Sequence, residues 1–192
     1  HGLNVWVRTN PLLLTTRPNS AMTSLARRLF ALTVCAATGF AQTYTWTQMS
    51  PANSPGALYS HTMTFDSSRN VTVLFGGYDG SAVLGKTWEY NGSDWTQITT
   101  ANSPSGRLNP TMVWESSRGR ILLFGGDTTT GGGGENNETW TYDGTDWTQI
   151  ITTTSPTPRY WHSMSYDSTR NRTVMFGGFD GPNGDLGDTW EY

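Results

Sequence analysis

A phrase that occurs three times along the chain constrains the fold more than any other feature. It begins Phe-Gly-Gly, continues after a loop with Thr-Trp-x-Tyr, and ends after a turn with Asp-Trp-Thr-Gln-Ile. The third copy reaches Tyr192 without its final Trp. A matching Trp precedes the first copy, so that Trp46, Trp95 and Trp147 follow one another at intervals of 49 and 52 residues. Because the difference in length falls in the loop after Gly-Gly, we predict one structural unit repeated along the chain.

Each unit is predicted to contain four short β-strands, named a, b, c and d in chain order. In the first unit strand a alternates in side-chain type, whereas strand b is an apolar run typical of a strand covered on both faces. An Asn-Gly pair, the strongest short hairpin signal, separates strands c and d. In the second unit Pro110 stands in strand a, which is tolerated only at the edge of a sheet. The predicted strands of the first unit cover residues 61–65, 71–75, 87–90 and 94–98.

A period near 50 residues, with four short strands and one Gly-Gly pair per unit, resembles the kelch repeat. The resemblance covers residues 44–192 and rests on three copies in register. It implies an all-β fold of kelch-type β-propeller blades, built as three four-stranded antiparallel repeats. Each blade has two faces to cover and therefore needs a neighbouring blade on both sides. The blades are predicted at roughly 46–94, 95–146 and 147–192.

The resemblance leaves the number of blades open, because propellers have about four to eight. The chain opens with a lone segment of strand d type at 45–49 and closes with a strand of type c at 189–192. The first is expected to complete the blade of the last. Three alternatives remain: three blades close a tight ring, two chains form a six-bladed homodimer, or the sequence is a fragment of a longer propeller. The absence of capping segments on the terminal blades favours the fragment.

The first 41 residues do not belong to the repeats. Residues 22–41 begin with basic side chains, continue with a short apolar run and end with small residues, as expected of a secretory signal peptide. The run is too short to span a membrane. We interpret residues 1–21 as a non-native upstream extension and residues 42–192 as the propeller. A secreted or periplasmic protein, free of the membrane after cleavage, is therefore expected.

Charge and cysteine content argue against several classes of function. The formal net charge is −3, so nothing in the composition predicts binding to nucleic acid or to an anionic membrane. The single Cys, Cys35, lies in the predicted signal peptide, which leaves the mature chain without a thiol nucleophile. Galactose oxidase is a kelch-type copper enzyme that needs a Cys joined to a Tyr, and the mature chain lacks that Cys.

The variable b–c loops and the d–a loops are expected to share one face of the propeller. Binding is usually placed on variable loops of a rigid scaffold, and the kelch resemblance implies binding through this face and the channel mouth. Trp161 is the first candidate, because the other copies have Ser60 and Asn109 at its position. It would stack on a sugar ring or an aromatic side chain, or else pack under a neighbouring loop. The candidate ligand-binding residues are Trp161, Tyr160, Arg159, Arg107, Asn109, Tyr59, Tyr78, Asp79, Phe179 and Asp180.

Two arginines at one repeat position have alternative interpretations. Arg107 and Arg159 could each bind a carboxylate of a ligand through two hydrogen bonds. Alternatively, each forms a structural ion pair with an acidic neighbour, and this interpretation is favoured.

The sequence predicts no catalytic residue, metal site or cofactor. His61 and His162 share one position in two units, but neither a Cys nor a third His accompanies them, which favours bonds within each blade over a metal site. The loop 180–188 carries several side-chain oxygens. It lacks the complete pattern of an EF-type calcium loop, and turns capped by Asp and Asn explain it as well.

The interpretation that follows is a non-enzymatic binding module that presents the b–c and d–a loops to a glycan or a partner protein. One alternative is a sugar-active kelch enzyme of the mutarotase type. That activity would require a His, an Arg and a carboxylate at the channel mouth, of which Arg159 and Asp180 could supply two. The other alternative is a structural or adhesion role as part of a longer propeller.

Overall fold

The computed structural model describes residues 44–192. The predicted upstream extension and signal peptide lie outside the described residues. Residues 46–192 form one compact unit of β-strands and loops. None of the described residues belongs to a helix that is long and apolar enough to cross a membrane.

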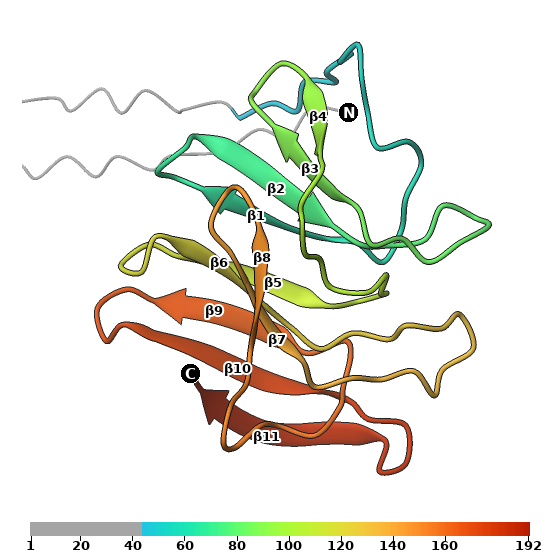
Figure 1. Cartoon of the computed structure of the whole chain (residues 1–192), viewed down its shortest axis with the longest axis vertical. Coiled ribbons are helices and arrows are strands. Elements are labelled where there is room, and N and C mark those ends of the chain that lie inside the picture. Colours follow the sequence, from blue (N-terminus) through green and yellow to red (C-terminus); the bar gives the residue numbers. More distant parts are fainter. Residues whose placement is uncertain (1–43) are drawn as a thin grey trace, which may run out of the picture. The chain divides into compact units, whose positions relative to one another are not determined.

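Three antiparallel sheets follow one another along the chain (Figure 1). The strands within each sheet pair in chain order, as predicted for a, b, c and d. The first sheet contains β1 (Thr62–Asp66), β2 (Val71–Phe75), β3 (Thr87–Tyr90) and β4 (Trp95–Ile98). The second contains β5 (Thr111–Glu115), β6 (Arg120–Phe124), β7 (Thr139–Tyr142) and β8 (Trp147–Ile150). The third contains β9 (Ser163–Asp167), β10 (Arg172–Phe179) and β11 (Asp185–Glu191). The all-β prediction with kelch-type blades is thereby confirmed.

One predicted strand is wrong. Residues 44–50 have no regular secondary structure, and the third sheet has three strands, with β11 at its edge. The expected closure of the last blade by residues 45–49 is therefore not formed. The residues that follow this segment are tied to the first blade, where the amide and the side chain of Asn53 each donate to Asp94 at 2.7 Å.

The first strands of neighbouring sheets lie against one another. β1 contacts β5, and β5 contacts β9. The hydroxyl of Thr62 accepts a hydrogen bond from the amide of Met112 at 3.1 Å, and the hydroxyl of Thr111 donates to the carbonyl of His162 at 2.8 Å. Pro110 directly precedes β5, at an edge of the second sheet. Its missing N–H therefore interrupts no hydrogen bonding between strands.

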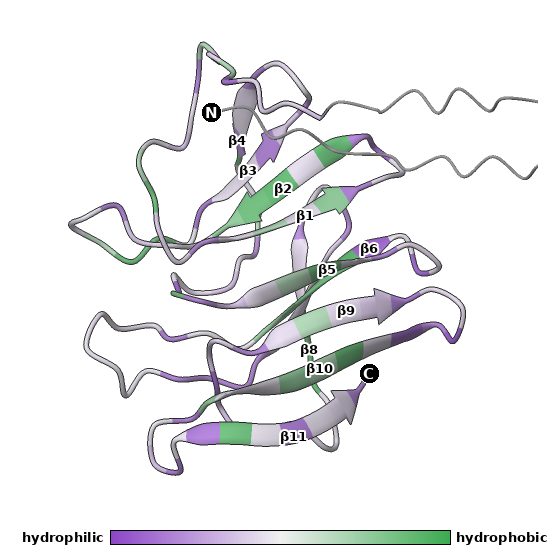
Figure 2. Ribbon diagram, turned by 180° about the vertical axis from the view of Figure 1, so that it is seen from behind, coloured by the Kyte–Doolittle hydropathy of each residue, from purple (hydrophilic) through white to green (hydrophobic). Residues whose placement is uncertain are grey.

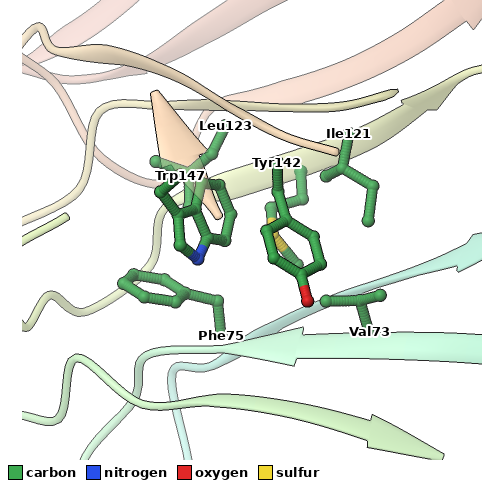
Figure 3. Close-up of a cluster of buried hydrophobic side chains, with 7 residues drawn as sticks. Val73, Phe75, Ile121, Leu123, Tyr142 and Trp147 are labelled. Atoms are coloured by element: carbon green, nitrogen blue, oxygen red, sulfur yellow. The ribbon is translucent and has the colours of Figure 1, made fainter. Parts of the chain in front are cut away.

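The apolar core lies between the sheets rather than within one of them. Hydrophobic residues are concentrated in the second strand of each sheet, β2, β6 and β10 (Figure 2). Figure 3 shows how the first and second sheets meet. The cluster joins Val73 and Phe75 of the first sheet to Met112, Ile121, Leu123, Tyr142 and Trp147 of the second.

Trp147 of β8 is the largest side chain in this interface and is fully buried. Its indole stacks on Tyr142 at 5.0 Å between ring centroids and lies 5.1 Å from Phe75. Its Nε1 donates a 2.9 Å hydrogen bond to the hydroxyl of Thr87 in the preceding blade. Burial of such an aromatic contributes a few kcal/mol of stability. The repeated d-strand Trp therefore holds two blades together.

At the opposite end from the b–c loops, the a–b turns tie each blade to the next. The carboxylate of Glu89 accepts hydrogen bonds from Arg69 of its own blade at 2.6 Å and from the hydroxyl of Tyr142 in the second blade at 2.9 Å. Burial and the charge of Glu89 raise the pKa of Tyr142 above its ordinary value. In the next pair of blades the buried Glu115 accepts a bond from the hydroxyl of Thr173 at 2.8 Å.

Candidate functional site

The d–a loop and the b–c loop pair with each other at one register in all three blades. The bridged residues are Tyr59 with Tyr78, Leu108 with Asp127, and Tyr160 with Phe179. The two kinds of loop therefore share one end of the blades, as predicted. We call the surface formed by segments 56–61, 77–86, 104–110, 127–138, 156–162 and 179–184 the loop face.

The Gly-Gly pairs of the first two blades contact the d–a loop of the following blade. The amide of Gly126 donates to the carbonyl oxygen of Arg159 at 2.9 Å. Gly125 has a φ of +66°, and a Cβ on it would lie 2.5 Å from the same oxygen. A side chain at Gly125 would thus meet backbone that cannot move aside, which explains why this position is Gly.

Arg159 is fully buried below the loop face. Its guanidinium forms two hydrogen bonds to the carboxylate of Asp188, at 2.6 and 2.8 Å, and one to the carbonyl of Gly177 at 2.9 Å. Arg159 is the main reason that the pKa of Asp188 lies well below its ordinary value. The guanidinium thus has no free side to offer a ligand.

Arg107 repeats this arrangement in the preceding blade, where it is also fully buried. It donates to Glu138 at 2.6 Å and to the carbonyl of Gly125 at 3.1 Å. For both arginines the structure shows the structural ion pair rather than a guanidinium open to a ligand carboxylate. Their role is to fix the d–a loop against the b–c loop.

Three aromatic rings gather on the loop face of the third blade. The Tyr160 ring lies 4.6 Å from that of Trp161 and 5.6 Å from that of Phe179, while the Trp161 and Phe179 rings are 6.2 Å apart. We call these three residues the aromatic cluster. Sequence reasoning named all three, and the Tyr160–Phe179 bridge between the two loops brings them together.

Trp161 stands apart from its repeat equivalents in both exposure and backbone. Its side chain is 65% exposed, so it does not pack under a neighbouring loop. Its φ is +60°, and Ser60 and Asn109 at the same repeat position have φ values of +58° and +50°. Asn tolerates this left-handed conformation, whereas a bulky side chain is unusual there and is strained by about 1–2 kcal/mol. Strain that persists at an exposed ring points to selection for a role other than stability.

A smaller aromatic pair lies on the first blade. Tyr59 and Tyr78 meet edge to face with centroids 5.4 Å apart, and Tyr59 is mostly exposed. Among residues 44–192 no ring contact joins this pair to the aromatic cluster of the third blade. The predicted aromatic candidates thus form two groups rather than one continuous surface.

The polar candidates shape the loops. Asp79 accepts hydrogen bonds from the amides of Ala82 and Ser81, at 2.8 and 2.9 Å, and these bonds lower its pKa to about 2. Asp180 is buried and accepts two bonds from Asn183, at 2.8 and 2.6 Å. Such turns correspond to the capped-turn interpretation of loop 180–188. The amide of Asn109 donates to the carbonyl of Ser60 at 2.8 Å.

Two acidic residues beside the aromatic cluster were missed by sequence reasoning. Burial, and then the negative charges of Asp127 and Glu135, raise the pKa of Tyr160 above its ordinary value. Glu135 also lies next to the third blade, since a Cβ on Gly181 would sit 3.0 Å from its carboxylate. The loop 127–138 differs in length between the repeats, so no repeat pattern could have aligned these residues with the cluster. They give the surroundings of the cluster a negative charge.

His162 is buried under the loop face. Its ring meets Phe124 edge to face at 5.5 Å. Burial, and then the positive charge of Arg159, lower the pKa of His162 to about 4. The imidazole is therefore neutral at pH 7 and acts as a packing group.

In the part of the chain that the structure describes, no metal cluster is found, and the two residues named for the sugar-active alternative bond to other partners. No group of three or more His, Cys, Asp or Glu side chains gathers among residues 44–192. The sugar-active alternative relied on Arg159 together with Asp180. In the structure Arg159 donates a hydrogen bond to Asp188, and Asp180 accepts one from Asn183.

Comparison with known proteins adds one finding. Residues 33–192 match the family described as the KLHDC2/KLHL20/DRC7 Kelch-repeats domain. No curated protein shows a significant match to the sequence.

Proposed function

Because the chain belongs to the kelch-repeat family, whose domains generally mediate protein–protein interaction, we propose that it binds a partner protein through the loop face. The observation that supports this surface is Trp161, an exposed aromatic held in a strained left-handed backbone conformation. Trp is the residue type most often found at energetic hot spots of protein interfaces. We place the centre of the interface at the aromatic cluster.

The chemistry of the cluster indicates the kind of segment that it binds. Its three rings are tilted by 59° to 62° against one another, so they do not form a flat shelf. Such a surface suits an inserted apolar or aromatic side chain. The carboxylates of Asp127 and Glu135 nearby favour a Lys or Arg beside that side chain.

A panel of displayed random peptides tests the proposal even though the partner is unidentified. Peptides selected on the chain are expected to carry an aromatic or aliphatic residue next to a basic one. Trp161→Asn should weaken their binding at least tenfold, because an interface Trp typically contributes about 2 kcal/mol or more, and Asn suits the left-handed backbone. Ile151→Ala, a change at another exposed apolar residue, serves as the matched control. Peptides that bind both variants as well as the unmodified chain would contradict the proposal.

A glycan is the second candidate ligand, because one exposed face of the Trp161 indole is enough to stack on a sugar ring. A glycan array probed with the same two variants distinguishes the ligands. Binding of sugars that is lost in Trp161→Asn, together with no peptide selection, would assign the face to carbohydrate.

We also propose that the chain acts outside the cytoplasm, because residues 22–41 have the pattern of a secretory signal peptide. N-terminal sequencing of the exported protein should begin close to Gln42. An intact N-terminus well before this residue would contradict export by cleavage.

A further inference from the structure

Glu135, in the b–c loop of the second blade, is an acid without a cationic partner. The other glutamates among residues 44–192 form ion pairs with arginines: Glu89 with Arg69, Glu115 with Arg118, Glu138 with Arg107 and Glu191 with Arg170. In the part of the chain that the structure describes, Glu135 forms no ion pair and accepts one hydrogen bond, from the amide of Gly133 at 3.1 Å. Its negative charge is therefore not neutralised by these residues.

Two aspartates add to the negative charge around the aromatic cluster. Asp127 forms an isolated β-bridge with Glu135, and Asp185 lies opposite Phe179 in the pairing of β10 with β11. Within residues 44–192 neither aspartate has an ion-pair partner. Burial, followed by the charges of Asp127 and Glu135, raises the pKa of Tyr160. The aromatic cluster thus lies in a negative electrostatic field.

Glu135 and the aromatic cluster belong to one surface although they come from different blades. Gly181 follows Phe179 by two residues, and a Cβ on Gly181 would lie 3.0 Å from Oε1 of Glu135 and 3.8 Å from its Oε2. The bridge between Phe179 and Tyr160 joins this loop to the d–a loop that carries Trp161. The exposed indole of Trp161 is the largest ring of this surface.

A guanidinium group suits both an exposed indole and an unpaired carboxylate. It is flat and positively charged, so it stacks on an aromatic ring and donates two parallel hydrogen bonds to a carboxylate. A Lys ammonium carries the same charge but has no flat face to stack on the ring. A neutral apolar side chain covers the ring and leaves Glu135 without a cation.

We propose that the loop face binds an arginine of the partner protein, whose guanidinium stacks on Trp161 and pairs with Glu135. This inference rests on the proposed function and specifies the residue that the partner contributes. Trp161 supplies the stacking surface, and Glu135 determines the specificity for a cation. The corresponding loops of the other two blades, residues 78–86 and 179–188, contain no Glu. The site is therefore specific to the contact between the second and third blades.

Four pools of immobilised synthetic pentapeptides test the proposal. The flanking positions are randomised, and the central residue is Arg, citrulline, Lys or Leu. Citrulline has nearly the shape of Arg, but an uncharged urea group replaces the guanidinium. At low ionic strength the unmodified chain should bind the Arg pool about tenfold more tightly than the citrulline and Leu pools, with the Lys pool between them. Added salt should reduce this preference, because exposed charges are screened.

Two charge-removing variants show whether Glu135 reads the arginine. Glu135→Gln should reduce the preference for Arg over citrulline at least about threefold, and it should remain folded because Gln also accepts the bond from Gly133. Asp79→Asn is the matched control, since it removes an exposed carboxylate from the loop face of the first blade and Asn accepts the same hydrogen bonds. Its preference should be unchanged.

The outcomes separate this inference from the proposed function. Equal binding of the Arg and citrulline pools, or an unchanged preference in Glu135→Gln, would overturn the role of arginine. If the Leu pool then binds in a manner that depends on Trp161, the loop face remains a protein-binding surface for an apolar side chain. Equal binding of every pool to Trp161→Asn and to the unmodified chain would contradict the proposed function as well.

Discussion

Trp161 combines two properties that oppose each other, a large exposed ring and a left-handed backbone. Removing the ring alone does not isolate the backbone contribution, because ring contacts to Tyr160 and Phe179 are lost as well. A comparison of two substitutions at Trp161 isolates the backbone contribution, since both remove the ring.

We predict that Trp161→Asn is more stable to urea than Trp161→Ala by about 0.5–1 kcal/mol, because Asn adopts positive φ more readily than Ala. The same pair of substitutions at Tyr59, which does not have a positive φ, should show no such advantage for Asn. Equal stabilities for the two Trp161 variants would mean that the strain is absent.

His162 makes stability depend on pH. Its pKa is lowered from 6.5 to about 4 in the folded chain, so between these values the unfolded chain binds more protons. Stability is then complete above pH 6.5 and is lost as the pH falls toward 4, by up to roughly 3 kcal/mol. Thermal melts should show a fall in Tm across this window that is much smaller in His162→Leu. An identical fall in both proteins would contradict the burial of a neutral imidazole.

At the scale of elements, the Gly-Gly pair decides how one blade receives the loop of the next. Gly125→Ala should destabilise the fold by at least about 2 kcal/mol, because it combines a positive φ with a Cβ too close to the carbonyl of Arg159. Gly131→Ala is the matched control, since a Cβ there meets nothing within 4 Å. Urea unfolding of both variants measures the difference, and a harmless Gly125→Ala would show that the loops can separate.

The buried arginines should matter far more than those of the turns. Arg159→Ala removes hydrogen bonds to Asp188, Gly177 and the Thr157 loop, and we expect a loss of roughly 3 kcal/mol. Arg170→Ala removes bonds to Asp167 and Glu191 from a half-exposed side chain, and it should have a much smaller effect. Similar losses in chemical denaturation would show that Arg159 does not fasten the loops.

Repetition explains how much of these elements the sequence could predict. Strand order followed from the alternating strand a, the apolar strand b and the Asn-Gly hairpin, because each signal is local and occurs in register. An ion pair was favoured for Arg159 from the sequence, but its partner could not be named, because Asp188 of β11 lies 29 residues further along the chain. The left-handed φ of Trp161 could not be predicted either, since Ser60 and Asn109 at the same repeat position do not indicate that a Trp there would be strained.

At the scale of the whole molecule, a blade is stable only between neighbours, because each sheet has two apolar faces. Phe75 and Phe124, at one repeat position, are 0% and 5% exposed where the following blade covers them. The segment at 45–49 was expected to form a strand of the last blade, and it has no regular secondary structure. The position of Asn53 on Asp94 explains the failure, because it holds the segment beside the first blade.

Peptide binding to the loop face tests the central claim of this account most directly. We predict that peptides selected on the unmodified chain bind Trp161→Asn at least tenfold more weakly and bind Ile151→Ala with unchanged affinity. Equal binding to all three proteins would contradict the assignment of the interface to the loop face.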